Sequence, residues 1–165
     1  MMHVPLYSFA AFSNTGKTTF IEKLVAELKS RNLRVAVLKH DSHGFEMDRE
    51  GKDTWRFTQA GADMVAIVSD RQTAVLENRQ LTQEEALSFF HDVDLILTEG
   101  YKFADCPKIA IYRKASGNGL AGEPEDFEAI VTDTPFDAKV PQFPLDDVLP
   151  FAEFLLRDYE KRRRD

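Results

Sequence analysis

The fold is decided by residues 4–19, which read VPLYSFAAFSNTGKTT. The first nine are almost all apolar, as is typical of a buried strand, and the last seven are small or polar. Over 20–28 apolar side chains recur at the spacing of one helix face, and another short apolar run follows at 34–39. Strand, helix and strand within about forty residues predict a βαβ unit with a parallel pair of strands.

The remainder of the chain adds short strands, a hairpin and helices. Two apolar or β-branched runs at 65–69 and 73–78 are separated by a polar turn and predict an antiparallel hairpin, which would make the sheet mixed. A helix is expected to begin with a capping box formed by Thr82 and Glu85. Further strands are predicted at 93–98, 109–112 and 129–132, with a glycine-containing loop at 116–125 and a last helix from about 146.

Composition limits the classes of protein to which the chain can belong. Its 165 residues suit one domain, and 28 acidic against 21 basic residues give a net charge of −7, which offers no positive field to attract nucleic acid. The single cysteine, Cys106, excludes an internal disulfide and a multi-cysteine zinc site. No run approaches the ~18 apolar residues of a membrane span. The apolar start also lacks the basic stretch of a secretory leader, so we expect a cytoplasmic protein with no nucleic-acid or membrane partner.

Residues 13–19 carry the strongest chemical signal, because they fit a phosphate-binding loop between a strand and a helix. Gly16 permits close approach of the backbone, Lys17 supplies a positive charge, and Thr18 offers a hydroxyl to Mg²⁺. The full motif has a glycine where this chain has Ala11, whose methyl group restricts positive φ. The candidate nucleotide-binding residues of the loop are Ser13, Asn14, Thr15, Gly16, Lys17, Thr18 and Thr19.

Further polar residues follow two other predicted strands. Glu99 comes where a second acidic group is expected near the metal of a phosphate loop, although it fits equally an acidic residue that merely ends a strand. Lys39 and His40 lie at the C-terminal end of the second strand, where open α/β sheets bind ligands, and are candidates for phosphate or effector contacts. The candidate catalytic residues are Lys17 and Glu99, and the candidate metal ligands are Thr18, Glu99 and Asp41.

Together these features predict an α/β fold of the three-layer, P-loop NTPase-like type. The sheet is expected to be mostly parallel, with one antiparallel hairpin. Nothing in the sequence marks an interdomain linker, so residues 1–165 are expected to form a single P-loop nucleotide-binding domain.

Four blocks of sequence occur in a fixed order along the chain. They are Ser-x-Thr-Gly-Lys-Thr-Thr at 13–19, Lys39-His40-x-x-His43, Asp48-x-x-Gly51-Lys52-Asp53 leading to Ala60-Gly61-Ala62, and Asp94-Leu-Ile-Leu-Thr-Glu99-Gly100-Tyr-Lys102. In these blocks the chain resembles the MobB family, molybdopterin-guanine dinucleotide biosynthesis protein B. Many nucleotide hydrolases share the first block, whereas the second and third together are specific.

The resemblance implies a GTP-binding adaptor protein with weak GTPase activity, which forms a homodimer. GTP and Mg²⁺ are its implied ligands. Its implied partner is the MobA-type guanylyltransferase that joins GMP to the molybdenum-bound pterin, and molybdopterin itself is a further candidate ligand. Carried over by position, 14–19 would hold the phosphates, Thr18 and Glu99 would serve Mg²⁺, and 39–53 would face the ligand or partner.

Asp133 is the candidate for guanine recognition, because related GTPases read the base with an aspartate after a late strand. A carboxylate accepts two hydrogen bonds from the guanine edge, which adenine cannot donate in that pattern. The alternative for Asp133 is an aspartate that ends a strand and begins a turn.

Two other functions remain open from the residues alone. A small-molecule kinase would need an acceptor pocket and an arginine-bearing lid, and no compact lid is visible in the sequence. A metal-inserting GTPase would bind its metal through His40 and His43. Hydrolysis is expected to be slow, since the sequence assigns neither an in-line arginine finger nor a water-positioning glutamine. Arg49, Arg56 and Arg113 are the candidates for the arginine. The charged stretch 48–53 fits either a solvated loop or a segment that responds to nucleotide.

Overall fold

The computed structural model describes residues 4–41, 43–100 and 106–163. Contacts along the chain divide it into two compact units, one formed by Met1–His40 and Phe90–Asp165 and the other by Asp41–Phe89. The single nucleotide-binding domain expected over the whole chain stays a prediction. Lys102, from the fourth block of the family pattern, lies outside the described residues.

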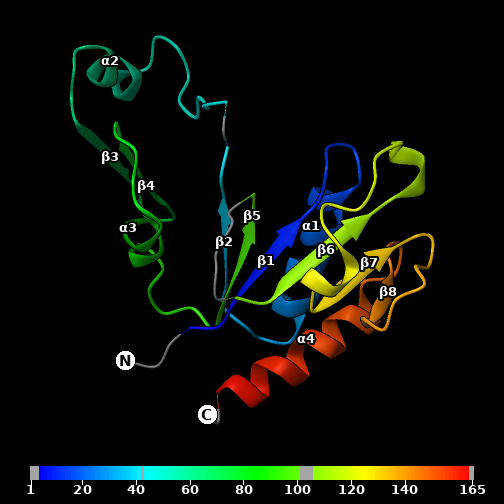
Figure 1. Ribbon diagram of the computed structural model, residues 1–165. Helices are drawn as coiled ribbons and strands as arrows, with labels where there is room; N and C mark the ends of the chain where they lie inside the picture. Colours follow the sequence, from blue (N-terminus) through cyan, green and yellow to red (C-terminus); the bar gives the residue numbers. More distant parts are fainter. Residues whose placement is uncertain (1–3, 42, 101–105, 164–165) are drawn as a thin grey trace. The chain divides into compact units, whose positions relative to one another are not determined.

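The first unit is built on a six-stranded sheet in the order β2-β5-β1-β6-β7-β8, in which every neighbouring pair is parallel (Figure 1). The strands are β1 (Leu6–Ala10), β2 (Val35–Lys39), β5 (Leu95–Glu99), β6 (Lys108–Tyr112), β7 (Ala129–Thr132) and β8 (Gln142–Pro144). The strands predicted from apolar runs are therefore confirmed. The first two are parallel but do not pair with each other, because β5 lies between β1 and β2.

One face of this sheet is covered by α1 (Lys17–Ser30) and α4 (Leu149–Arg162) (Figure 1). Alternate strand residues such as Phe9 and Leu97 point to this face and pack with Leu24 of α1 and Phe151 of α4. Full burial of a side chain of this kind contributes about 1.5–3 kcal/mol. Both helices have 14 residues, and within the described ranges no helix is long and apolar enough to cross a membrane.

Loops cover the opposite face of β6 and β7. Ala110 and Ile130 point to this side and pack with Phe127, Leu120 and Phe136. The loop predicted after β6 is confirmed, and two short 3₁₀ turns lie at its ends, η1 (Lys114–Ser116) and η2 (Pro124–Asp126).

The second unit contains the predicted hairpin and the predicted capped helix. Strands β3 (Met64–Val68) and β4 (Thr73–Glu77) pair antiparallel but form a two-stranded sheet of their own, so the expectation that they join one mixed sheet is wrong. Helix α3 (Gln83–Ser88) begins at the predicted capping box. The Glu85 N–H donates to Oγ1 of Thr82 at 3.2 Å, and the Thr82 N–H donates to Oε2 of Glu85 at 2.8 Å.

The sequence patterns do not predict two of the elements, α2 (Asp53–Gln59) and β8. Helix α2 has no buried residue, so no apolar stripe marks it in the sequence. Strand β8 has three residues, ends at a proline and lies at the edge of its sheet, where a missing backbone donor is tolerated.

Candidate functional site

The phosphate loop joins the end of β1 to the start of α1, at the edge of the sheet where the parallel strands end (Figure 1). Gly16 precedes α1 with a φ of +85°, and Asn14 has a φ of +63°, a region that glycine and asparagine tolerate best. Thr15 is buried, and its hydroxyl donates to the Phe12 carbonyl oxygen at 3.0 Å. Helix α1 has no side-chain cap, so its first N–H groups suit an anion.

Alanine fits the loop at position 11, where the general motif has glycine. Positive φ among the described non-glycine residues is confined to Asn14, Asn32 and Asp92. Ala11 therefore does not adopt the backbone region that its methyl group disfavours, and it packs against the main core.

The two predicted catalytic residues meet beside the loop. Nζ of Lys17 lies 3.5 Å from Oε1 of Glu99, and the two side chains are only 17% and 14% exposed. Glu99 ends β5, in register with Phe9 of β1 and Lys39 of β2, so the three side chains lie on the sheet face that α1 covers. Partial burial makes the attraction between Lys17 and Glu99 stronger than it would be at an open surface.

The strand ends next to Glu99 approach each other closely. The His40 N–H donates to the Glu99 carbonyl oxygen at 2.8 Å. Gly100 follows with a φ of +82°, and a Cβ at this position would lie 2.7 Å from the carbonyl oxygen of His40. The structure thus brings Lys39 and His40 to Glu99, as the sequence predicts for this edge of the sheet.

Oxygen donors suited to Mg²⁺ are present at the loop. Because Mg²⁺ keeps several waters and shares phosphate oxygens, one or two protein oxygens suffice to hold it. The exposed Thr18 hydroxyl and the Glu99 carboxylate are donors of this kind, so the residues fit the ion. Asp41 belongs to the second unit, where its Oδ1 accepts from the His43 N–H at 2.9 Å, and its role at the metal stays a prediction. No cluster of three or more His, Cys, Asp or Glu side chains that could hold a metal occurs in the part of the chain that the structure describes.

Two side chains from the connection between β6 and β7 contact the phosphate loop. Nε of Arg113 donates to the Thr15 carbonyl oxygen, and Nδ2 of Asn118 donates to the Ser13 carbonyl oxygen, both at 3.4 Å. The sequence marks Arg113 as one of three candidate arginines, and the other two belong to the second unit. It does not mark Asn118, whose only sequence signal is its place in a glycine-containing loop.

Asp133 lies at the end of β7 and shapes a turn there. Its Oδ1 accepts from the Lys114 N–H at 2.9 Å and from the Thr134 hydroxyl at 3.2 Å. These contacts match the turn alternative, and they also hold the carboxylate in place at the strand ends. A role for Asp133 in reading guanine stays a prediction.

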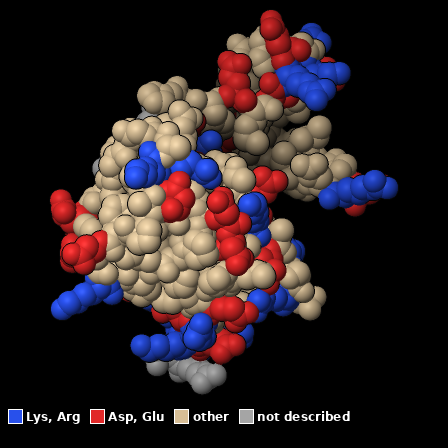
Figure 2. Space-filling model, turned by 90° about the vertical axis from the view of Figure 1, so that its right-hand side faces the viewer, with Lys and Arg blue, Asp and Glu red and all other residues tan. Residues whose placement is uncertain are grey.

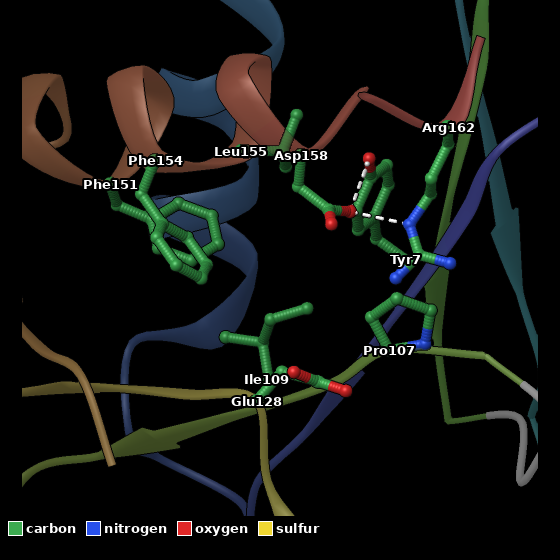
Figure 3. A pocket seen from close by; sticks show the side chains of 9 residues that line it. All are labelled: Tyr7, Pro107, Ile109, Glu128, Phe151, Phe154, Leu155, Asp158 and Arg162. Atoms are coloured by element: carbon green, nitrogen blue, oxygen red, sulfur yellow. Dashed lines mark hydrogen bonds and ion pairs between the residues drawn. The ribbon is translucent and has the colours of Figure 1, made fainter. Parts of the chain in front are cut away.

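A separate cluster lies around Tyr7, at the end of the same sheet where the parallel strands begin (Figure 3). The Tyr7 hydroxyl donates to Oδ2 of Asp158 at 3.0 Å, and Nε of Arg162 contacts the same oxygen. Burial raises the pKa of Tyr7, and the Asp158 carboxylate raises it further. A cavity of about 20 Å³ beside the cluster, lined also by Glu128 and Phe154, has room for about one water molecule. The hydrogen bond between Tyr7 and Asp158 connects α4 to β1.

Figure 2 shows basic and acidic side chains interspersed on one face of the molecule. Neither sign forms a broad area on that face. The face in view therefore offers no broad basic surface to attract a phosphate chain.

Comparison with known families and proteins gives consistent results along the chain. The model of the MobB family, molybdopterin guanine dinucleotide synthesis protein B, matches residues 6–133. That span includes the phosphate loop, Glu99, Arg113 and Asp133.

Two molybdopterin-guanine dinucleotide biosynthesis adapter proteins are similar to this chain over nearly their full lengths. The one from Haemophilus influenzae is 33% identical over an alignment of 156 residues, which covers 92% of this chain and 88% of that protein. The one from Escherichia coli K12 is 31% identical over 171 residues, covering 96% of this chain and 95% of that protein. The crystal structure of Bacillus subtilis MobB is similar with a TM-score of 0.74 and 30% identity, over 94% of this chain and 97% of that one.

Proposed function

Since this chain belongs to the MobB family, molybdopterin guanine dinucleotide synthesis protein B, we propose that it is a GTP-binding adapter protein in the biosynthesis of molybdopterin guanine dinucleotide. The observation that carries the nucleotide part of the proposal is the phosphate loop. There the start of α1, without a side-chain cap, lies next to Gly16 and to the pair formed by Lys17 and Glu99.

The geometry of the loop suits a nucleoside triphosphate. N–H groups of the loop and of the first turn of α1 bind phosphate oxygens, and the helix dipole favours their negative charge. Lys17 exchanges its contact with Glu99 for the outer phosphates. Thr18 and Glu99 would hold Mg²⁺, which would supply positive charge that offsets the phosphate oxygens. Weak GTP hydrolysis at this site belongs to the same proposal.

Asp133 is the residue that we assign to the guanine base. Its place at the end of β7, beside the end of β6, puts the carboxylate on the same sheet edge as the phosphate loop. The hydrogen bonds from Lys114 and Thr134 restrict its rotation, and a fixed carboxylate can accept from two donors of guanine at once.

A homodimer is part of the proposal, and the hairpin of the second unit supports it. Met64, Val68 and Val75 lie on one face of the β3-β4 sheet by register and are all exposed. An isolated two-stranded sheet is only marginally stable in water, and its outer edges have unpaired backbone groups. A second copy of this chain, pairing through its own hairpin, would cover the exposed apolar face and the unpaired strand edges. The MobA-type guanylyltransferase is the proposed partner of the adapter, in the cytoplasm.

Calorimetric titration of the full chain with GTP and with ATP, each with Mg²⁺, tests the proposed function. We expect GTP to bind more tightly than ATP. Lys17→Ala is expected to weaken GTP binding at least tenfold, because a charged contact to phosphate contributes about 1.5–3 kcal/mol.

Lys23→Ala is the matched control for this titration. Lys23 lies on the exposed side of the same helix, so its removal should leave the affinity for GTP unchanged. Wild-type protein that binds neither nucleotide, or a Lys17→Ala variant that binds GTP as the wild type does, would contradict the proposal.

A further inference from the structure

The connection between β6 and β7 lies against the phosphate loop on the side of the loop's carbonyl groups. Arg113 follows β6 directly, and its Nε donates to the carbonyl oxygen of Thr15. Asn118 donates to the carbonyl oxygen of Ser13. Two carbonyl groups of the loop are therefore held by one neighbouring segment, and one of the two donors is charged.

Arg113 also fills the space beside the glycine of the motif. A Cβ on Gly16 would lie 3.2 Å from Nη2 and 3.6 Å from Nε of Arg113. Among the described residues, the acidic side chain paired with Arg113 is Asp146, at 3.8 Å between Nη2 and Oδ1, and Asp146 is largely exposed. A pair of that length at the surface offsets little of the guanidinium charge. A positive charge thus lies beside the loop, outside the sequence motif.

A charge in this position acts on a bound phosphate chain without touching it. The N–H groups of a phosphate loop converge on the ligand, and the carbonyl oxygens that Arg113 and Asn118 contact belong to the same backbone. A cation that donates to such a carbonyl polarises the peptide chain and strengthens its N–H donors. The same cation attracts the phosphates directly, and this attraction grows with the charge of the ligand.

We infer that Arg113 is a positioning residue that sets the preference of the site for nucleoside triphosphates over diphosphates and monophosphates. The inference rests on the proposed nucleotide site and extends it, because it assigns selectivity for phosphate number to a side chain outside the phosphate-loop motif. Asn118 holds the same loop through a neutral hydrogen bond. Variants of the two residues therefore distinguish the effect of a positive charge beside the loop from the effect of a hydrogen bond that holds the loop in place.

The test measures the Kd of GTP, GDP and GMP with Mg²⁺ by calorimetry on the full chain. Arg113→Ala is expected to weaken GTP binding about tenfold, GDP binding about threefold and GMP binding little, since the attraction follows ligand charge. Arg113→Lys keeps the charge and should retain most of the wild-type ratio of GDP to GTP dissociation constants. Asn118→Ala should weaken all three nucleotides by the same factor.

Arg31→Ala is the matched control. The Arg31 side chain is 34% exposed against 38% for Arg113, and it pairs with Glu27 and Glu153 on the helices. This variant should bind all three nucleotides as the wild type does. Thermal unfolding of each variant shows that it is folded before titration. If the alanine variant unfolds, Arg113→Gln takes its place, because it removes the charge and retains a hydrogen-bond donor.

Three results would overturn the inference while leaving the proposed function intact. They are an Arg113→Ala variant that is folded and binds every nucleotide as the wild type does, an equal loss for all three nucleotides, or a lysine variant whose GDP-to-GTP ratio falls as far as that of the alanine variant. Wild-type protein that binds no GTP, or binding that is insensitive to Lys17→Ala, overturns the proposed function itself. The two failures are therefore distinguishable.

Discussion

Gly100 determines how closely the ends of β2 and β5 approach each other at the candidate site. Its φ of +82° lies in the left-handed region, and a Cβ would come within 2.7 Å of the His40 carbonyl oxygen, a backbone atom that cannot rotate away. The preceding residue, Glu99, accepts the N–H of the same histidine. The glycine therefore also fixes the backbone position of Glu99, whose side chain pairs with Lys17.

Gly100→Ala is expected to lower the free energy of unfolding by about 2 kcal/mol or more, as the sum of a disfavoured φ and the close contact. Urea denaturation measures the change. Gly117→Ala is the control, because Gly117 has a φ of +72° but nothing within 4 Å of its Cβ position. It should cost only about 1 kcal/mol for the backbone. Equal losses in the two variants would show that the contact with His40 costs nothing.

Single residues of the site differ in how well the sequence predicts them. A local motif predicts Lys17, and the position at the end of an apolar strand predicts Glu99. The structure pairs the two side chains. Arg113 reaches Thr15 across 98 positions of the chain, and Asn118 reaches Ser13 across 105. Such contacts depend on the order of strands in the sheet, and no local pattern encodes that order.

Elements with local signals are the ones that the sequence predicts. The hairpin has its polar turn, and α3 has its capping box, and both are confirmed. The position of β5 between β1 and β2 has no local signal, because the order of parallel strands is set by packing across the sheet rather than by chain order. Helix α2 lacks a buried stripe and is missed for that reason.

At α3, Thr82→Ala is expected to lower the stability of the helix by about 1 kcal/mol, because an N–H at its start loses its acceptor. Amide hydrogen exchange within α3 measures the effect. Ser88→Ala is the control, since the Ser88 hydroxyl at the other end donates to the Glu85 carbonyl oxygen and caps no N–H. Faster exchange to the same extent in both variants would contradict a specific capping role.

The capping box also makes α3 sensitive to pH. The Thr82 N–H and the Arg79 side chain hold the pKa of Glu85 below its ordinary value of 4.5. Because the folded-state pKa is lowered, the stabilising contribution of Glu85 is complete above the ordinary pKa and is lost as the pH falls through the lowered one. The protection of the α3 amides against exchange, corrected for the pH dependence of the intrinsic exchange rate, should therefore fall below that range.

At the scale of the whole molecule, apolar surface is distributed unequally between the two units. The first unit buries large side chains from both helices and from β1, β5, β6 and β7 in one continuous core. Within the described part of the second unit, the buried apolar side chains are Val65 and Ala86 alone. Hydrophobic patterning predicts each strand of the hairpin but not what covers it, because the covering surface would come from another chain.

Val75→Lys tests whether a second copy of this chain covers the hairpin. Val75 and Val37 are 45% and 44% exposed, and they lie in the second and first units respectively. A lysine on the face shared by Met64, Val68 and Val75 would bury a charge between two hairpins. Sedimentation at micromolar concentration should therefore show a dimer for the wild type and a monomer for Val75→Lys. Val37→Lys adds the same charge outside the hairpin and should remain dimeric. A monomeric wild type, or a Val75→Lys variant that sediments as a dimer, would show that a second copy of this chain does not cover this face.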